Sequence, residues 1–166
     1  MEEESKMVTK MNNKKIAVIL IRGTVNLSFD LKKTLEFLRL KKKHACVVID
    51  DNQVNRGMLN KVKDYVTYGL IDEAFYKQML DKRGEMIGKV KIADSETKID
   101  TAFIAKEYFA GNLKLINFEE KGIKPFFRLM PPVGGFERAG IKMPYAKGGV
   151  LGNRSDDISK LILKMM

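Results

Sequence analysis

The stretch IAVILI, residues 16–21, decides the fold of this chain. It is the longest uninterrupted apolar run in the 166 residues, and the pair Arg22-Gly23 ends it. A continuous apolar run of this length is typical of a strand that lies in the centre of a sheet or is covered on both faces. The run therefore predicts a strand at the centre of a sheet.

Two helices and two more strands follow this run. Leucines at helical spacing after Ser28 predict a first helix, and the apolar run 45–49 predicts a second strand. A second helix is expected to bury Val54, Met58, Val62 and Val66, and a short third strand is expected within 65–70. The order strand, helix, strand, helix, strand indicates an α+β fold. Its small sheet is covered on one face by two helices and is ferredoxin-like in part.

The rest of the chain divides into three further parts. Residues 1–13 have no apolar period and are predicted to be a mobile tail, ahead of the core of residues 14–70. Residues 71–120 are predicted to form a helical annex, with one helix between Asp72 and Gly84 and another between Asp100 and Gly111. Residues 121–166 hold all four prolines and seven of the 13 glycines, so an extended loop that ends in a helix is expected there.

Charge is distributed unevenly along the chain. The formal net charge is +10, to which residues 1–70 contribute +6, residues 71–120 contribute −2 and residues 121–166 contribute +6. Two basic ends around an acidic middle are typical of a nucleic-acid-binding protein, without distinguishing RNA from DNA. With Cys46 as its only cysteine the chain has no internal disulfide, and no secretory signal or membrane span is visible. A cytoplasmic protein is expected.

Few residues suit catalysis. His44 is the only histidine, and its alternation with Cys46 along a strand leaves a dyad geometrically open. A solvent-facing or phosphate-facing His44 beside a buried Cys46 is the simpler interpretation. Asp50 and Asp51 follow a strand, where carboxylates often bind metals, but no third acidic residue is marked to join them. The sequence therefore predicts no enzyme, no metal and no cofactor.

Features suited to RNA lie in two regions. Arg56, Asn60 and Lys63 share one helix face beside Gly57, a costly helix residue that would permit close approach of a sugar-phosphate chain. The C-terminal loop carries cations, glycine pairs and aromatic rings. Of these rings Phe136 or Tyr145 is expected to be free for stacking on bases. The loop is expected to be mobile until RNA orders it.

The predicted RNA-binding set follows from these features. It comprises Arg22, Lys32, Lys33, Lys42, Lys43, Arg56, Gly57, Asn60, Lys61, Lys63, Arg128, Gly134, Gly135, Arg138, Lys142, Lys147, Gly148, Gly149 and Arg154.

Several motifs in order resemble one known family. IAVILIRG (16–23), KTLEFLRLKKKHACVVID (33–50) and VNRGMLNKVKDYVTYG (54–69) resemble the L-thirty family of large-subunit ribosomal proteins. FRLMPPVGGF (127–136) and GGVLGNR (148–154) resemble its longer archaeal and eukaryotic branch, and the short acidic N-terminus favours the archaeal type. Val133 stands where relatives often carry arginine, which removes one possible phosphate contact.

The resemblance implies a structural, non-catalytic protein of the large ribosomal subunit. It implies binding to large-subunit rRNA near the 5S rRNA, contacts with neighbouring ribosomal proteins, and a monomer within the ribosome. A free-standing regulatory RNA-binding protein with the same fold is the alternative hypothesis.

Overall fold

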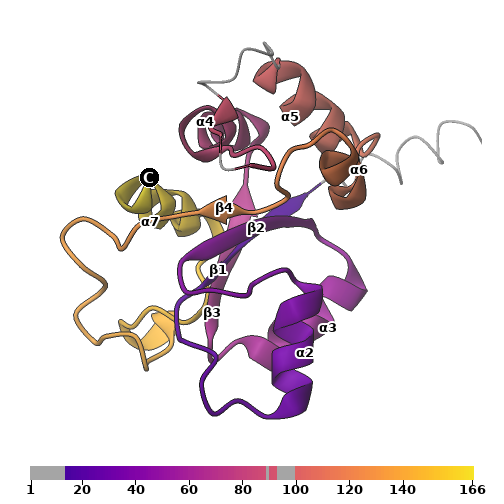
Figure 1. Ribbon diagram of the computed structural model, residues 1–166. Coiled ribbons are helices and arrows are strands. Elements are labelled where there is room, and N and C mark those ends of the chain that lie inside the picture. Colours follow the sequence, from indigo (N-terminus) through magenta and orange to yellow (C-terminus); the bar gives the residue numbers. More distant parts are fainter. Residues whose placement is uncertain (1–13, 89, 93–99) are drawn as a thin grey trace, which may run out of the picture.

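The computed structural model describes residues 14–88, 90–92 and 100–166, so the predicted tail of residues 1–13 lies outside the described residues. A five-stranded sheet forms the centre of the molecule, in the order β4-β2-β1-β3-β5 (Figure 1). Its strands are β1 (Lys15–Leu20), β2 (Ala45–Asp50), β3 (Val66–Ile71), β4 (Phe127–Arg128) and β5 (Gly152–Asn153). Every residue of β1 is buried, as the apolar run predicts for a central strand.

Two helices cover the first face of the sheet. They are α2 (Phe29–Phe37) and α3 (Gln53–Val62). Alternate residues of β1, including Val18 and Leu20, pack with Leu35, Leu59 and Val62 on this face. The predicted α+β core is thereby confirmed.

The predicted buried stripe of α3 is wrong at both of its ends. Val54 is 73% exposed, and Leu59 is buried in its place. Val54 lies in the first turn of α3, and the residues that pack onto the sheet lie in its second half. At the other end, Val66 is buried as a residue of β3, because α3 ends at Val62.

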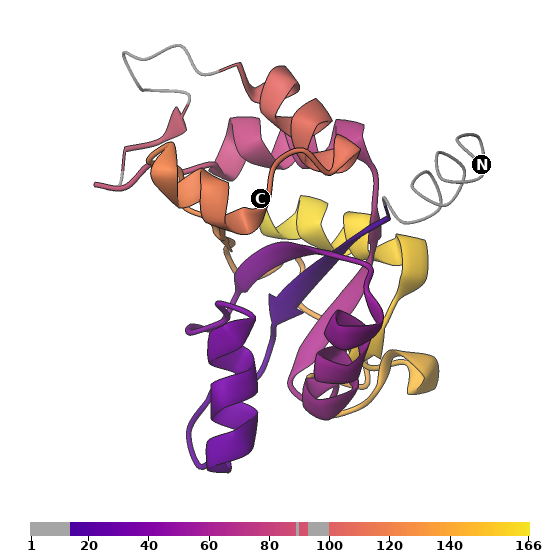
Figure 2. The same ribbon diagram turned by 90° about the vertical axis from the view of Figure 1, so that its right-hand side faces the viewer.

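Four helices cover the opposite face of the sheet. They are α4 (Glu73–Arg83), α5 (Thr101–Ala110), α6 (Leu115–Glu120) and α7 (Ile158–Met165). The sequence prediction placed helices on one face only. Ala17, Ile19 and Ile21 pack into this second cluster of buried residues. The Tyr108 hydroxyl donates a hydrogen bond of 2.6 Å to the Val48 carbonyl oxygen, which ties α5 to β2. Figure 2 shows the two helical layers on either side of the sheet.

The ends of α5 follow local capping rules. Asp100 accepts hydrogen bonds from the amides of Ala102 and Phe103, at 3.0 and 3.2 Å, and so caps α5. Gly111 ends that helix with φ 85°, a left-handed conformation that glycine adopts without a Cβ clash. Phe103 on this helix is 55% exposed.

The C-terminal loop is folded onto the core, which differs from the expected mobile segment. The amides of Met130 and Val133 donate to carbonyl oxygens of Met165 and Lys164, at 2.9 and 2.8 Å. The amide of Val150 donates to the Met143 carbonyl oxygen at 3.0 Å, around the short helix η2 (Tyr145–Lys147). A second short helix, η3 (Ser155–Asp157), leads into α7. Proline prevents regular elements here, but it does not prevent these individual backbone hydrogen bonds.

Candidate RNA-binding surface

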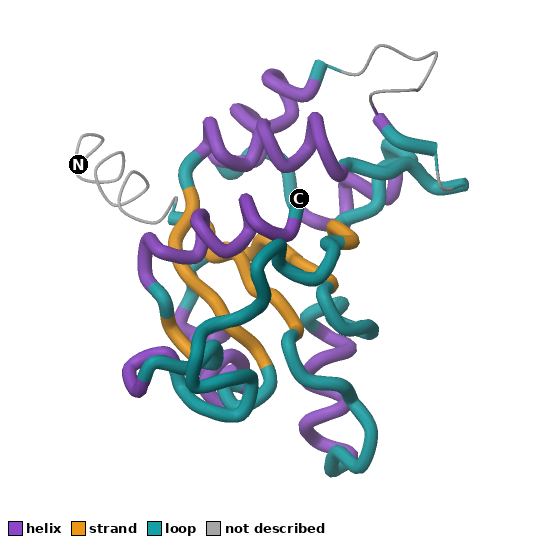
Figure 3. The backbone as a smooth tube through the Cα atoms, turned by 90° about the vertical axis from the view of Figure 1, so that its left-hand side faces the viewer, coloured by secondary structure: helices purple, strands orange, loops and turns teal. Residues whose placement is uncertain are grey.

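Strand directions bring distant basic segments to one end of the sheet. Because β1 runs antiparallel to β2 and β3, the end of β1 meets the beginnings of both neighbours. β5 is parallel to β3, so the loop that precedes it reaches the sheet from the same end. β4 is antiparallel to β2 and pairs Arg128 with Ala45 there. Figure 3 shows these connections gathered below the strands. We call this region the basic end.

Backbone hydrogen bonds fix the neighbours within the basic end. The amide of Arg22 donates to the Tyr65 carbonyl oxygen at 3.1 Å, and its guanidinium donates to the Asp64 carbonyl oxygen at 3.2 Å. The amide of His44 donates to the Leu20 carbonyl oxygen at 2.8 Å. The end of β1 therefore lies between the turn after α2 and the turn after α3. Of the predicted site residues, Arg22, Lys42, Lys43 and Lys63 lie on these segments, whereas Lys32 and Lys33 lie in α2, Lys61 in the last turn of α3 and Arg128 in β4.

A hollow of about 450 Å³ lies at the β2–β4 edge of this region. We call it the edge hollow. Five cations contribute to its lining, together with apolar side chains and one carboxylate; its residues are Arg39, Lys41, Lys42, Lys43, Ala45, Glu119, Phe126, Arg128 and Leu129. Lys42, Lys43 and Arg128 belong to the predicted RNA-binding set, and the structure brings them together across 85 residues of sequence. Arg39, Lys41 and Phe126 are additions that the sequence prediction missed.

The predicted face of α3 is only partly available. The Arg56 guanidinium forms a two-bond ion pair with Asp51, with Nη2 2.6 Å from Oδ2. The hydrogen bond from Arg56 lowers the pKa of the Asp51 carboxyl below its usual value. The charge of Arg56 is thus balanced within the protein. Asn60 and Arg56 line a separate hollow of about 240 Å³ between α3, β3 and β5, while Gly57 is exposed with open space around it.

The glycines of the C-terminal loop differ in accessibility. Gly134 and Gly135 adopt left-handed conformations, at φ 82° and 79°, with open space where a Cβ would lie. Gly148 is also left-handed and exposed. Gly149 is buried, and a Cβ there would lie 2.1 Å from the Met143 carbonyl oxygen. Close internal packing therefore explains Gly149, and the prediction that it contacts RNA is withdrawn. The loop cations Arg138, Lys142 and Lys147 are exposed.

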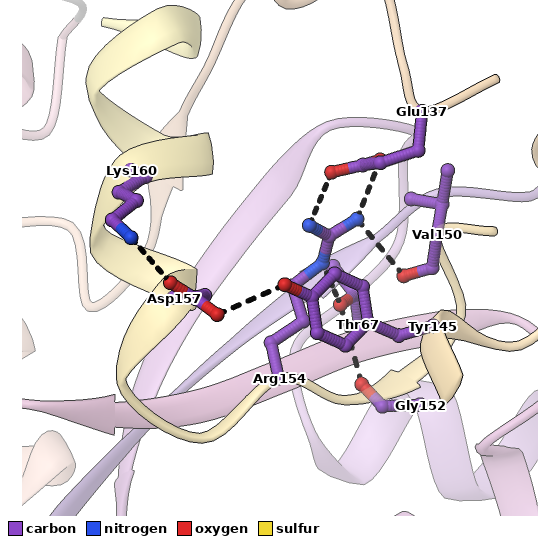
Figure 4. Close-up of polar contacts among 8 residues, drawn as sticks. All are labelled: Thr67, Glu137, Tyr145, Val150, Gly152, Arg154, Asp157 and Lys160. Carbon is purple, nitrogen blue, oxygen red and sulfur yellow. Dashed lines mark hydrogen bonds and ion pairs between the residues drawn. The ribbon is translucent and has the colours of Figure 1, made fainter. Parts of the chain in front are cut away.

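Arg154 also differs from the predicted role of a phosphate contact. It is 4% exposed, and its guanidinium forms an ion pair with Glu137 through both terminal nitrogens (Figure 4). Nε donates to Thr67 Oγ1 at 3.0 Å, and Nη2 donates to the Val150 carbonyl oxygen at 3.3 Å. The bond from Arg154 lowers the pKa of Glu137. Arg154 thus joins the loop residues Glu137 and Val150 to Thr67 of β3, so its role is structural.

Of Phe136 and Tyr145, one was expected to be free for stacking, but both contact other residues of the protein. Phe136 stacks on His44, with ring centroids 6.1 Å apart. The Tyr145 ring lies 4.4 Å from the Arg154 guanidinium carbon, and its hydroxyl donates to Asp157 at 2.9 Å. Phe126 is half-buried and borders the edge hollow. Phe127 alone is fully packed in the core.

The residues considered for catalysis have structural roles. Burial raises the pKa of the Cys46 thiol to about 12, so Cys46 is not a nucleophile. Burial and the nearby Lys43 lower the pKa of His44. Asp50 pairs with the buried Lys15, and Asp51 pairs with Arg56. No group of three potential metal ligands occurs among the described residues. Within the same residues, every helix is too short or too polar to cross a membrane.

Comparison with known proteins agrees with this architecture. Residues 16–66 match the family described as Ribosomal protein L30p/L7e. Relatives named large ribosomal subunit protein uL30 extend the similarity to most of the chain. The relative from Methanococcus maripaludis strain C5 is 40% identical over 154 residues, covering 90% of this chain and 98% of its own length. The relative from Aeropyrum pernix is 40% identical over 156 residues, with the same coverage.

The relative from Methanopyrus kandleri is 40% identical over 149 residues, which cover 88% of this chain and all of its own length. The similarity therefore includes α4–α7 and the C-terminal loop as well as the first three strands. The chain belongs to the L30 family of ribosomal proteins, in its long archaeal type.

Proposed function

We propose that this protein is a structural component of the large ribosomal subunit and that its basic end binds folded rRNA. The observation that carries the proposal is the convergence of Lys41, Lys42, Lys43 and Arg128 at the β2–β4 edge. Among the described residues none of these four forms an ion pair with a carboxylate. Unpaired cations gathered on a folded surface repel one another, and RNA phosphates relieve that repulsion.

Family membership supports both parts of the proposal. The relatives are named as large-subunit ribosomal proteins rather than as enzymes, so the prediction of a non-catalytic protein is confirmed. The resemblance also favours a position near the 5S rRNA, with contacts to adjoining domains of the large rRNA. The exposed loop cations Arg138, Lys142 and Lys147 would extend the RNA contact along the basic end.

The helices of residues 71–120 are proposed to face away from RNA. This segment carries a net charge of −2, and a phosphate surface would repel it. Figure 1 shows α4 and α5 above the strands, away from the basic end, and only Glu119 at the end of α6 reaches the edge hollow. A basic neighbouring protein is the partner that this charge favours. Crosslinks to RNA should accordingly concentrate outside residues 71–120.

The test compares two triple variants with the same change in charge. Lys41→Gln, Lys42→Gln and Lys43→Gln together remove three cations of the basic end. The control is Lys77→Gln, Lys82→Gln and Lys106→Gln, which removes three exposed cations of α4 and α5. Affinity for large-subunit rRNA is measured from 50 to 200 mM salt.

The basic-end variant should lower the slope of log affinity against log salt by about 2–3, because each phosphate contact contributes about 0.7–0.9 to that slope. The control should leave the slope unchanged. Equal effects of the two variants would contradict an interface at the basic end. A protein that leaves purified large subunits in a high-salt wash would instead favour the regulatory RNA-binding alternative.

A further inference from the structure

The edge hollow has the size of a site for a small molecule or a single nucleotide. Its volume of about 450 Å³ lies within the range of about 300–1,000 Å³ that ligand pockets occupy. Its walls come from the turn after α2, from α6, from the start of β2 and from β4. An A-form duplex presents a convex backbone and a major groove that side chains cannot read. A hollow of this kind suits a nucleotide that has left its helix.

The apolar part of the hollow offers a stacking surface. Ala45, Phe126 and Leu129 line it, and the Phe126 ring is half-buried against the first core cluster. The Arg128 guanidinium carbon lies 5.9 Å from the centre of that ring, near the outer limit of a cation–π contact. Arg128 is exposed, so it can move to admit a base and then stack on it.

The charged part of the hollow selects for phosphate. Glu119 is the only carboxylate among its lining residues, and it already pairs with Arg39. Lys41, Lys42 and Lys43 are exposed around the hollow with no carboxylate to neutralise them among the described residues. Consecutive ammonium groups beside a ring match the phosphate and the base of one nucleotide.

We propose that the edge hollow binds a single unstacked nucleotide of RNA, with its base on Phe126 and its flanking phosphates on Lys41, Lys42 and Lys43. This proposal rests on the proposed rRNA-binding function and adds to it the form of RNA that is recognised. The basic end then binds RNA in two ways. Its cations attract the RNA backbone in general, and the edge hollow binds one extruded base at the β2–β4 edge.

The experiment uses two RNA hairpins that differ by one bulged adenosine. The fully paired hairpin reports general attraction, and the bulged hairpin adds the proposed nucleotide. Binding of the full chain is measured by fluorescence anisotropy at fixed salt. Wild-type protein should bind the bulged hairpin about 5- to 150-fold more tightly, which is the range for stacking one base on an aromatic ring.

Phe126→Leu retains an apolar side chain and removes the ring. It should abolish the preference for the bulged hairpin while leaving affinity for the paired hairpin within about 2-fold. Phe126→Tyr should restore the preference. Phe103→Leu, a change of the same type at an exposed ring on α5, is the matched control and should have no effect. Thermal unfolding monitored by circular dichroism confirms that each variant is folded.

Each result separates this inference from the broader function. Equal wild-type affinity for the two hairpins would overturn the nucleotide site and leave rRNA binding intact. The absence of binding to either hairpin and to large-subunit rRNA would overturn both proposals. A hexa-aspartate peptide is also added as a competitor to the complex of the protein with the bulged hairpin. If the peptide displaces the hairpin while the bulge gives no added affinity, the hollow binds an acidic protein segment and the nucleotide site is overturned.

Discussion

Replacing Glu137 with glutamine tests whether the Arg154 ion pair holds the C-terminal loop in place. Arg154 is 4% exposed, whereas the Glu137 side chain is 33% exposed. The substitution leaves a buried guanidinium without a counter-ion, with the glutamine amide oxygen, Thr67 Oγ1 and the Val150 carbonyl as its remaining acceptors. Removing one member of a fully buried pair costs about 3–5 kcal/mol. Because Glu137 is partly hydrated, we expect about 2–3 kcal/mol.

For a chain of this length, that loss corresponds to a decrease in Tm of about 5–10 °C. Differential scanning calorimetry measures the decrease at pH 7. Glu36→Gln, at an exposed residue of α2 that forms no ion pair among the described residues, is the matched control and should change stability by less than about 0.5 kcal/mol. Hydrogen exchange should show faster exchange at the amides of Val133 and Val150 in the Glu137 variant. Equal Tm values for the two variants would refute the anchoring role of Arg154.

The pH dependence of the Glu137 effect has a definite sign. Arg154 lowers the pKa of Glu137 in the folded protein below the ordinary value of 4.5. Stability from a carboxyl with a lowered pKa is fully present above its unfolded pKa and is lost as pH falls through the folded pKa. The Tm difference between wild type and the variant should therefore be constant from pH 6 to 8 and narrow below pH 4.5. A difference that stays constant down to pH 3.5 would contradict the ion-pair mechanism.

Two further predictions concern Gly57 and Cys46. Gly57→Ala has open space for its methyl group and should stabilise α3 by about 0.5–1 kcal/mol in chemical denaturation, and a simultaneous loss of rRNA affinity would support close approach of RNA at this helix. Undiminished affinity would remove Gly57 from the interface. The buried Cys46 thiol, whose pKa is raised to about 12, should react with a thiol reagent at pH 8 only after unfolding, and rapid reaction in the native protein would contradict its burial.

The apolar periodicity was sufficient to predict most of the core. Residues 16–21 specify a central strand because every side chain is apolar. The strand order was not predicted, because β2 and β3 are consecutive in sequence but lie on opposite sides of β1. The periodicity did not reveal α6, since a helix of six residues is too short to establish a period. It also could not show that α4–α6 join α7 on one sheet face, because that packing depends on contacts between segments far apart in sequence.

The role of Arg154 shows why the site was harder to predict than the fold. In sequence, Arg154 is indistinguishable from the exposed Lys147 of the same loop. Its burial results from pairing with Glu137, which is 17 residues away. A signal for this pairing was present, because Glu137 is the only acidic residue between Lys121 and Ser155. RNA phosphates would repel a carboxylate on a surface that binds RNA. A single carboxylate in an otherwise basic loop therefore indicates that it pairs with a cation inside the protein.

The internal contacts of the loop change the expected energetics of RNA binding. If RNA had to order residues 131–154, the entropy cost would subtract from every phosphate contact. In the structure Phe136 stacks on His44, and Tyr145 contacts both Arg154 and Asp157, so the framework exists before RNA arrives. The exposed cations Arg138 and Lys142 then require only side-chain ordering. If the exposed loop cations bind RNA as proposed, the buried residues of the loop contribute without touching RNA, because they reduce the entropy that binding must overcome.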